Sequence, residues 1–204
     1  MFKTREKDYT CNGVKVLRSS HRSIRELKRI HKPSIHGFRI WPSSWLLLDY
    51  FTRIRLSSQL NIVDLGCGWG IAGICCVKNF GSVVTCIDSD SAVFPYVHLL
   101  AGINDVRVKT IEADFSDLTG KDFKNIDVMI GSDICFWDDM VDTLKQMMIR
   151  ALDSGVKTIV FADPGRPTFE RLGKYFMKEG TGNIINWEIS RPYSMQGRIL
   201  RVCI

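Results

Sequence analysis

The sequence lacks the features of several protein classes. Its longest early apolar run, residues 45–48, is far shorter than the roughly 20 residues that a membrane helix needs. There is no internal repeat, no low-complexity tract and no CxxC pair. With 45% hydrophobic residues in a chain of 204, the protein is too apolar to be disordered and long enough to bury a core without disulfides. We therefore expect one domain, or one domain with an appendage.

Metal-ligand patterns are also missing. The histidines His21, His31, His36 and His98 have no ligand spacing, and we expect no metal. The seven cysteines are odd in number, and several lie in apolar runs such as residues 74–77, which predicts small buried side chains in a reducing compartment. No apolar stretch follows the basic first residues, so we expect no secretory signal, no membrane association and a cytoplasmic location.

Acidic residues are scarce near the N-terminus. Residues 1–40 hold 11 Lys and Arg against 3 Asp and Glu, whereas the remainder holds 17 against 19. This imbalance predicts a basic N-terminal extension over residues 1–40 and a near-neutral domain over residues 41–204. The extension could contact an acidic protein, a nucleic acid or an anionic surface, and an ordinary solvated helix face is an equal alternative.

Short apolar runs alternate with helical patterns from residue 61 onward. Strands are predicted at 61–65, 82–87, 106–111, 126–130 and 157–161, with two further strand-like runs at 184–189 and 198–203. Helices are predicted at 20–30, 45–54, 71–78, 92–103, 139–152 and 168–177, and residues 1–17 are expected to be loose or weakly stranded. The alternation predicts an α/β fold with a mostly parallel sheet, helices on both of its faces and an N-terminal helical extension.

A glycine-rich turn follows the first strand of the predicted sheet. Gly66, Gly68 and Gly70 alternate directly after that strand and open a helix, so the backbone can bend sharply and approach a ligand closely. The GxGxG spacing differs from the GxGxxG of nicotinamide enzymes and from the phosphate loop, which needs a Lys-Ser/Thr pair. Asp64 lies two residues before the first glycine, where a carboxylate would repel a pyrophosphate and favour a ligand with an ammonium group.

Two further carboxylates follow strands of the same sheet. Asp88 ends the second strand, where an acid can accept two hydrogen bonds from a ribose diol. Asp114 follows the third strand and precedes Phe115, so an acid can accept from an adenine amino group while the aromatic ring covers the base. One such aspartate is common in a turn, but Asp64, Asp88 and Asp114 each belong to a different strand, and together they indicate a nucleoside site.

With these motifs in this order, residues 61–163 resemble a class I S-adenosyl-L-methionine (SAM) dependent methyltransferase. The resemblance implies a Rossmann-like fold with a seven-stranded, mostly parallel sheet, and SAM as the cofactor. The residues that it implies for cofactor binding are Trp41, Asp64, Gly66, Gly68, Gly70, Asp88, Ser89, Asp114, Phe115 and Ser132. In this assignment the glycines line the methionine end with Asp64 near its ammonium, whereas Asp88 holds the ribose and Asp114 the adenine.

A narrower resemblance rests on three further motifs. Trp41-Pro42-Ser43-Ser44, Asp133-Ile134-Cys135-Phe136 and Asp163-Pro164-Gly165-Arg166 together are similar to the family 16 group. That group includes protein-lysine methyltransferases and proteins labelled predicted nicotinamide N-methylases. One position departs from it: of two asparagines four residues apart, Asn104 is kept and Leu100 replaces the other.

The narrower resemblance implies two catalytic residues, Asp133 and Phe136. Asp133 would orient an amine or draw its proton, and Phe136 would face the cationic centre as an aromatic wall. A helix-capping Asp and a core Phe are the alternatives.

We therefore expect an enzyme that transfers a methyl group from SAM to an amine, with a protein lysine as the preferred acceptor and a small-molecule amine as the alternative. A non-catalytic binding module that keeps the fold is a further alternative, as is a nucleic-acid binder led by the basic extension. No Asn/Asp-Pro-Pro-Tyr/Phe motif follows the fourth strand, which argues against methylation of base amino groups. We expect the protein to be a monomer.

Overall fold

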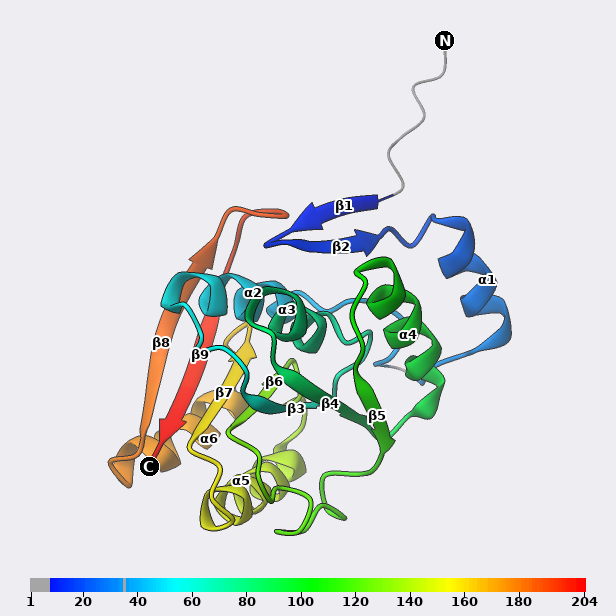
Figure 1. The fold of residues 1–204 in the computed structure, drawn as a ribbon. Coiled ribbons are helices and arrows are strands. Elements are labelled where there is room, and N and C mark those ends of the chain that lie inside the picture. The colour runs from blue at the N-terminus through cyan, green and yellow to red at the C-terminus, as the bar shows by residue number, and fades with distance from the viewer. Residues whose placement is uncertain (1–7, 35) are drawn as a thin grey trace.

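A seven-stranded sheet forms the centre of the molecule (Figure 1). The computed structural model describes residues 8–34 and 36–204; residues 1–7, which hold part of the predicted basic extension, and residue 35 lie outside the described residues. The strands of the sheet are β3 (Asn61–Leu65), β4 (Val83–Asp88), β5 (Lys109–Glu112), β6 (Val128–Ser132), β7 (Thr158–Asp163), β8 (Gly182–Ile189) and β9 (Met195–Cys203). Their order is β5-β4-β3-β6-β7-β9-β8, and β9 is antiparallel to both of its neighbours while the other pairs are parallel. The predicted α/β class and mostly parallel sheet are confirmed.

Helices cover both faces of this sheet (Figure 1). One face carries α2 (Ser43–Ile54), α3 (Ile71–Phe80) and α4 (Phe94–Ile103), which follows the short 3₁₀ helix η1 (Ser91–Val93), and the other carries α5 (Asp138–Asp153) and α6 (Pro167–Lys178). Neighbouring residues of one strand point to opposite faces, so Ile62 and Val63 pack in two separate apolar clusters. Both are buried, which explains why the central strands are continuous apolar runs in the sequence.

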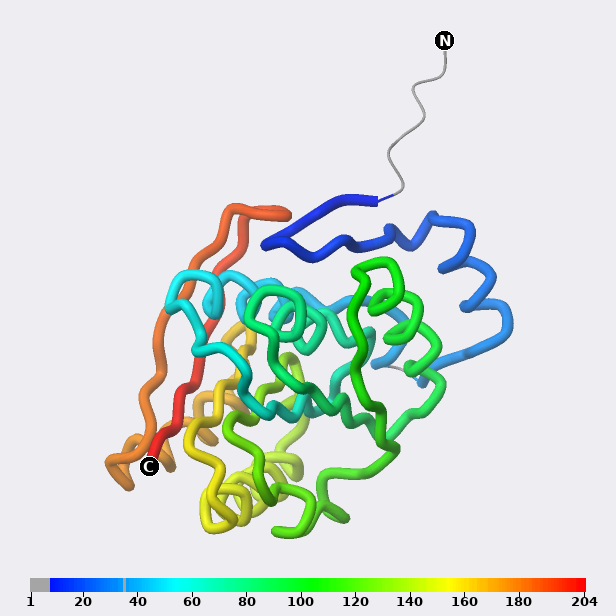
Figure 2. Tube along the Cα trace, viewed as in Figure 1, coloured from blue at the N-terminus to red at the C-terminus, as the bar shows by residue number. Residues whose placement is uncertain are grey.

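A two-stranded hairpin precedes the sheet. β1 (Asp8–Cys11) and β2 (Val14–Leu17) pair antiparallel across Asn12 and Gly13, which have positive φ values of 46° and 79°. A two-residue turn with positive φ at both positions suits the twist of paired strands, and Asn-Gly is its preferred sequence. The basic helix α1 (Arg22–Ile30) comes next in the chain, and Figure 2 shows the trace passing from the hairpin into it. This helix contacts α4. The extension therefore contains a hairpin as well as the predicted helix.

Asn104 joins this hairpin to the rest of the molecule. Its side-chain oxygen accepts a hydrogen bond from the Lys15 N–H, and its amide group donates to the Lys15 carbonyl, both at 2.8 Å. Asn104 is only 3% exposed, so loss of this amide would leave buried polar groups of the backbone without partners. Leu100, which departs from the family 16 pattern, is fully buried in the apolar core instead.

The cysteines form no disulfide, and all seven are described. Five are buried, and Cys67 and Cys203 are half-buried. The prediction of small buried thiols is confirmed for those five. In the part of the chain that the structure describes, no helix has both the length and the apolar character to cross a membrane.

Candidate functional site

A cavity of about 240 Å³ lies at the carboxyl ends of β3, β4, β5 and β6. Nine of the twelve predicted site residues line it: Trp41, Gly66, Gly68, Asp88, Ser89, Asp114, Phe115, Asp133 and Phe136. A hollow of about 840 Å³ elsewhere on the surface is larger. We place the site in the smaller cavity because several carboxylates and the glycine turn converge there, at the strand ends where parallel sheets bind ligands.

The glycine turn brings its backbone to the cavity wall. Gly66, Gly68 and Gly70 have φ values of 56°, 52° and 72°, in the left-handed region that side chains disfavour. A Cβ at Gly66 would lie 2.6 Å from the Ile134 methyl carbon Cγ2, whereas a Cβ at Gly68 would meet no atom within 4 Å. Gly68 therefore leaves space on the cavity side that any side chain would fill.

Asp88 and Asp114 lie at neighbouring strand ends with different surroundings. The two carboxylate oxygens of Asp88 accept from the Gly68 N–H at 2.9 Å and the Asp90 N–H at 3.1 Å. Burial nevertheless raises the pKa of Asp88. Asp114 accepts from both the N–H and the hydroxyl of Ser116, and these bonds lower the pKa of Asp114. Each carboxylate thus supports its own turn and faces the cavity as well.

Three predicted cofactor residues lie behind the cavity wall. Asp64 is 2% exposed, and its carboxylate accepts from the Gly73 N–H at 3.0 Å, in the first turn of α3. Burial raises the pKa of Asp64 to about 7. Gly70 packs near Val97 and directly precedes α3, and the Ser132 hydroxyl lies 2.9 Å from the Ser44 hydroxyl. In this arrangement the three residues shape the turn and the strand end and do not line the cavity.

Asp133 belongs to a buried ionic network. It is a non-glycine residue with a positive φ of 55°, and it is 3% exposed. One oxygen accepts from Arg166 Nη1 at 2.9 Å and the other from the Ser43 N–H at 2.8 Å. The same Arg166 nitrogen also contacts Asp163 Oδ2 at 2.5 Å. Burial opposes ionisation of Arg166, but Asp163 and Asp133 together raise the pKa of its guanidinium. Arg166 therefore joins the Asp133 motif after β6 to the Asp163 motif at the end of β7.

An aromatic cluster of His36, Trp41, Phe136 and Trp137 forms another wall of the cavity. The Phe136 ring stacks on His36 with centroids 4.3 Å apart, and the Arg166 guanidinium carbon lies 4.2 Å from the same centroid. Both groups therefore lie over the Phe136 ring. The expected role of Phe136, an aromatic face turned to a cationic centre, stays a prediction.

Six lining residues were not expected from the sequence: Ser34, His36, Gly37, Ile134, Trp137 and Met140. The first three belong to a segment held over the cavity by long-range bonds, including Trp69 Nε1 to the Gly37 carbonyl at 2.9 Å. Neither ring nitrogen of His36 has a hydrogen-bond partner among the described residues, and both are buried. The local sequence of this segment does not predict its position at the cavity, because that position depends on contacts with residues far away in the chain.

Comparisons with known proteins extend these observations. A family model described as lysine methyltransferase matches residues 26–179. The chain is 32% identical over 130 residues to the histidine protein methyltransferase 1 homolog of Dictyostelium discoideum, which covers 59% of this chain and 41% of that protein. It is 23% identical over 131 residues to the electron transfer flavoprotein beta subunit lysine methyltransferase of Danio rerio, which covers 64% and 50%. The match spans half or less of the length of each of these relatives.

Solved structures share the fold at low identity. Human methyltransferase 10 domain containing protein matches with a TM-score of 0.61 and 13% identity, covering 78% of this chain and 81% of that chain. A tRNA (uracil-54, C5)-methyltransferase of Pyrococcus abyssi, solved in complex with S-adenosyl-L-homocysteine, matches with a TM-score of 0.53 and 17% identity, covering 78% and 38%. At these identities the likeness concerns the fold alone.

Proposed function

This chain belongs to the lysine methyltransferase family, which places it among the SAM-dependent methyltransferases, and we propose that it transfers a methyl group from SAM to the side-chain nitrogen of a protein lysine. The observation that carries the proposal is the set of charges around the cavity. Three aspartates, Asp88, Asp114 and Asp133, line it, and no lysine or arginine does so among the described residues. Arg166, which contacts Asp133 outside this lining, is also paired with Asp163. Such a site favours a cationic sulfonium and a cationic amine, and it disfavours a phosphate.

The cavity residues fit SAM in type and order. Asp88 would accept from the ribose hydroxyls, and Asp114 with Phe115 would hold the adenine. The open space at Gly68 would let the backbone contact the methionine part. When bound, SAM supplies a methyl group that its positive sulfur has already activated.

The chain's own residues would then position the acceptor. Both Asp133 oxygens already accept a hydrogen bond, one from the Ser43 N–H and the other from Arg166, and these bonds hold the carboxylate in a fixed orientation. Each oxygen keeps a second lone pair, through which it can orient an amine. The sequence allows Asp133 either to orient the amine or to draw its proton, and we assign it the first of these roles. Phe136 would act as a positioning residue that holds Arg166 and His36 in place.

Transfer of labelled methyl groups from SAM into a lysate of the source cells tests the proposal. A labelled protein that yields methyl-lysine on hydrolysis is the expected result, whereas a labelled metabolite or labelled RNA would contradict it. Asp133→Ala should bind SAM in calorimetry as the wild type does and lose transfer. Unchanged turnover in that variant would remove Asp133 from the mechanism.

A protein histidine is a second candidate acceptor, because two of the relatives are named histidine protein methyltransferase 1 homolog. The pH dependence of the rate separates the two acceptors. A lysine must lose a proton of pKa near 10.4 before it attacks, so kcat/KM should rise up to about pH 10. A histidine acceptor is neutral above its pKa of about 6.5, so the rate should level off near pH 7 to 8.

A further inference from the structure

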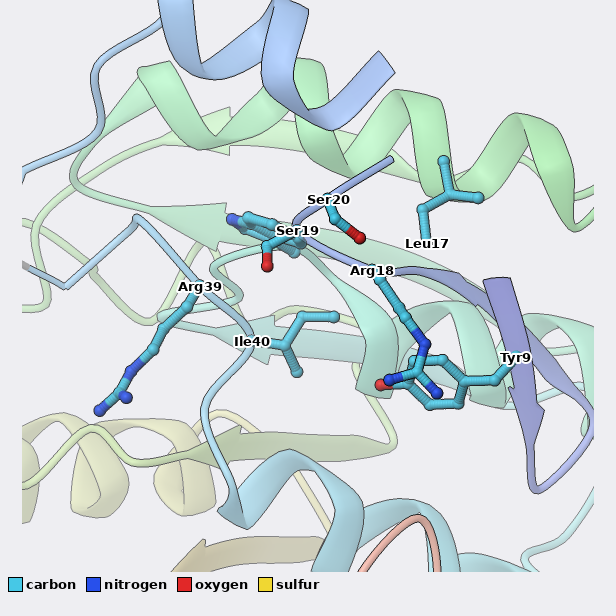
Figure 3. A pocket seen from close by; sticks show the side chains of 8 residues that line it. Tyr9, Leu17, Arg18, Ser19, Ser20, Arg39 and Ile40 are labelled. Carbon is cyan, nitrogen blue, oxygen red and sulfur yellow. The ribbon is translucent and has the colours of Figure 1, made fainter. Parts of the chain in front are cut away.

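A hollow larger than the cofactor cavity is lined mainly by residues of the N-terminal extension. It has a volume of about 840 Å³, and Arg18 and Arg39 lie on opposite sides of Ile40 in Figure 3. A second hollow of about 470 Å³ shares Tyr9 and Arg18 with it and continues to Arg191. We call the two hollows together the basic groove.

The basic groove has charge of one sign. Three arginines, Arg18, Arg39 and Arg191, line it, and no aspartate or glutamate does so in the described part of the chain. All three are exposed, and none has an ion-pair partner among the described residues. Elsewhere arginines do find carboxylates, as in the pairs Arg22–Glu26 and Arg53–Asp49. The groove therefore presents cations that the fold leaves unneutralised.

The basic groove lies beside the proposed active site. The Arg39 guanidinium carbon is 4.2 Å from the centroid of the Trp41 ring, and Trp41 lines the cofactor cavity. At the other hollow, burial raises the pKa of Tyr193, the charge of Asp133 adds to that increase and Arg39 opposes it. Trp41 also lies two residues before Ser43, whose N–H donates to Asp133 at 2.8 Å. A ligand at Arg39 would therefore be close to the residue that orients the acceptor.

We propose that the basic groove binds an acidic, extended segment of the protein substrate and so delivers the neighbouring acceptor side chain to Asp133. The inference rests on the proposed function, since it assumes a protein acceptor. Carboxylates of the segment would pair with Arg18, Arg39 and Arg191, and guanidinium groups hold carboxylates with two parallel hydrogen bonds. Leu17, Ile40 and Tyr9 would contact the apolar stems of the segment.

A peptide suits the groove better than a nucleic acid does. The groove combines arginines with apolar side chains such as Leu17 and Ile40, which suits a peptide that carries both carboxylates and apolar stems. A phosphate backbone would follow basic residues wherever they are exposed, including Arg25 and Arg29 on the outer surface of α1. These two arginines therefore provide a matched control with the same charge but outside the groove.

The test measures binding apart from methyl transfer. The probe is a fluorescent peptide of alternating Glu and Ser, without lysine or histidine, and its counterpart has Gln in place of Glu. Fluorescence anisotropy is measured for the wild type, for Arg18→Glu/Arg191→Glu and for Arg25→Glu/Arg29→Glu. SAM binding by calorimetry is recorded for all three proteins, which shows that each is folded and tests the proposed function separately.

We expect the wild type to bind the Glu peptide at least about tenfold more tightly than the Gln peptide. The groove variant should lose that preference, the α1 variant should keep it within about twofold, and SAM binding should be the same in all three. Equal binding of the Glu peptide by the groove variant and the wild type would overturn the proposal. Equal losses in both variants, together with tighter binding of a single-stranded RNA than of the peptide, would indicate a nucleic-acid surface and overturn it as well.

Discussion

The buried carboxyl of Asp64 makes the stability of this protein depend on pH. Burial raises the pKa of Asp64 from 3.8 to about 7, the hydrogen bond from the Gly73 N–H opposes the rise, and the charge of Asp88 adds to it. Between these two pH values the folded protein keeps a proton that the unfolded chain has lost, so the free energy of unfolding falls as the pH rises. At about 1.4 kcal/mol for each pH unit, the full loss is about 4 kcal/mol, as an upper value.

Asp64→Asn removes this titration and keeps an oxygen that can accept from Gly73. Urea denaturation of both proteins at pH 5 and pH 8 measures the effect. Two of the three units of the pKa shift lie in this range, so the wild type should lose about 3 kcal/mol more than the variant. Asp114→Asn is the control: hydrogen bonds from Ser116 lower the pKa of Asp114, so its contribution is lost only at more acidic pH. The same pH dependence in the wild type and in Asp64→Asn would refute the reasoning.

The same variant tests the predicted contact between Asp64 and the cofactor ammonium. An ionised Asp64 would attract that ammonium, so SAM and S-adenosyl-L-homocysteine should both bind the wild type more tightly as the pH rises through about 7. Asp64→Asn should bind both compounds weakly, with little change over that range. If the variant binds them as the wild type does at pH 8, Asp64 acts only through the first turn of α3 and the predicted contact is wrong.

Three further substitutions test other parts of the site. Asp133→Asn should lower the free energy of unfolding by about 2 kcal/mol. This is less than the cost of breaking a fully buried ion pair, because Arg166 is partly exposed and keeps its contact with Asp163. Thermal unfolding measures the loss, and an unchanged midpoint would contradict a stabilising ion pair between Arg166 and Asp133. Gly68→Ala and Gly81→Ala both put a side chain at positive φ into open space, so each should cost about 1 kcal/mol, but only Gly68→Ala should also weaken SAM binding in calorimetry. His36→Phe keeps a ring stacked on Phe136 and removes two buried nitrogens that have no hydrogen-bond partner among the described residues. The free energy of unfolding of the ligand-free protein should therefore rise by about 1 kcal/mol, while binding of the acceptor or of SAM weakens. Unchanged binding of both would exclude a contact between His36 and either ligand.

The limits of sequence-based prediction follow from burial. The strand β3 lies where its apolar run predicts, because both of its faces are buried. The edge strand β5 was expected at residues 106–111 and lies at Lys109–Glu112. Its position is set by pairing with β4, which joins Asp88 to Glu112, and an edge strand has no continuous apolar run that would mark its ends. The hairpin had a local signal, the Asn12-Gly13 pair between two short runs of strand-forming residues.

The site shows a similar division between local and long-range information. The glycine turn and the acids at the carboxyl ends of β4, β5 and β6 were predictable because a parallel sheet brings its strand ends to one edge. The contacts of Phe136 with Arg166 and His36 were not predictable, since both residues reach that ring from distant parts of the chain. The same holds for Asp64, whose carboxylate faces α3 because the backbone N–H of Gly73 lies within hydrogen-bond distance.

The N-terminal extension and the cofactor site share structural elements. The segment around Gly37 lines the cofactor cavity, yet it precedes the domain boundary expected at residue 41. Trp69, inside the glycine turn, donates to the Gly37 carbonyl and also lines the basic groove, where Arg39 stacks on Trp41. A segment that occupies the groove would therefore contact the elements that hold the cofactor turn. If it favours their ordered arrangement, SAM should bind more tightly when the groove is filled, and linkage then requires the acidic segment to bind more tightly in the presence of SAM by the same factor.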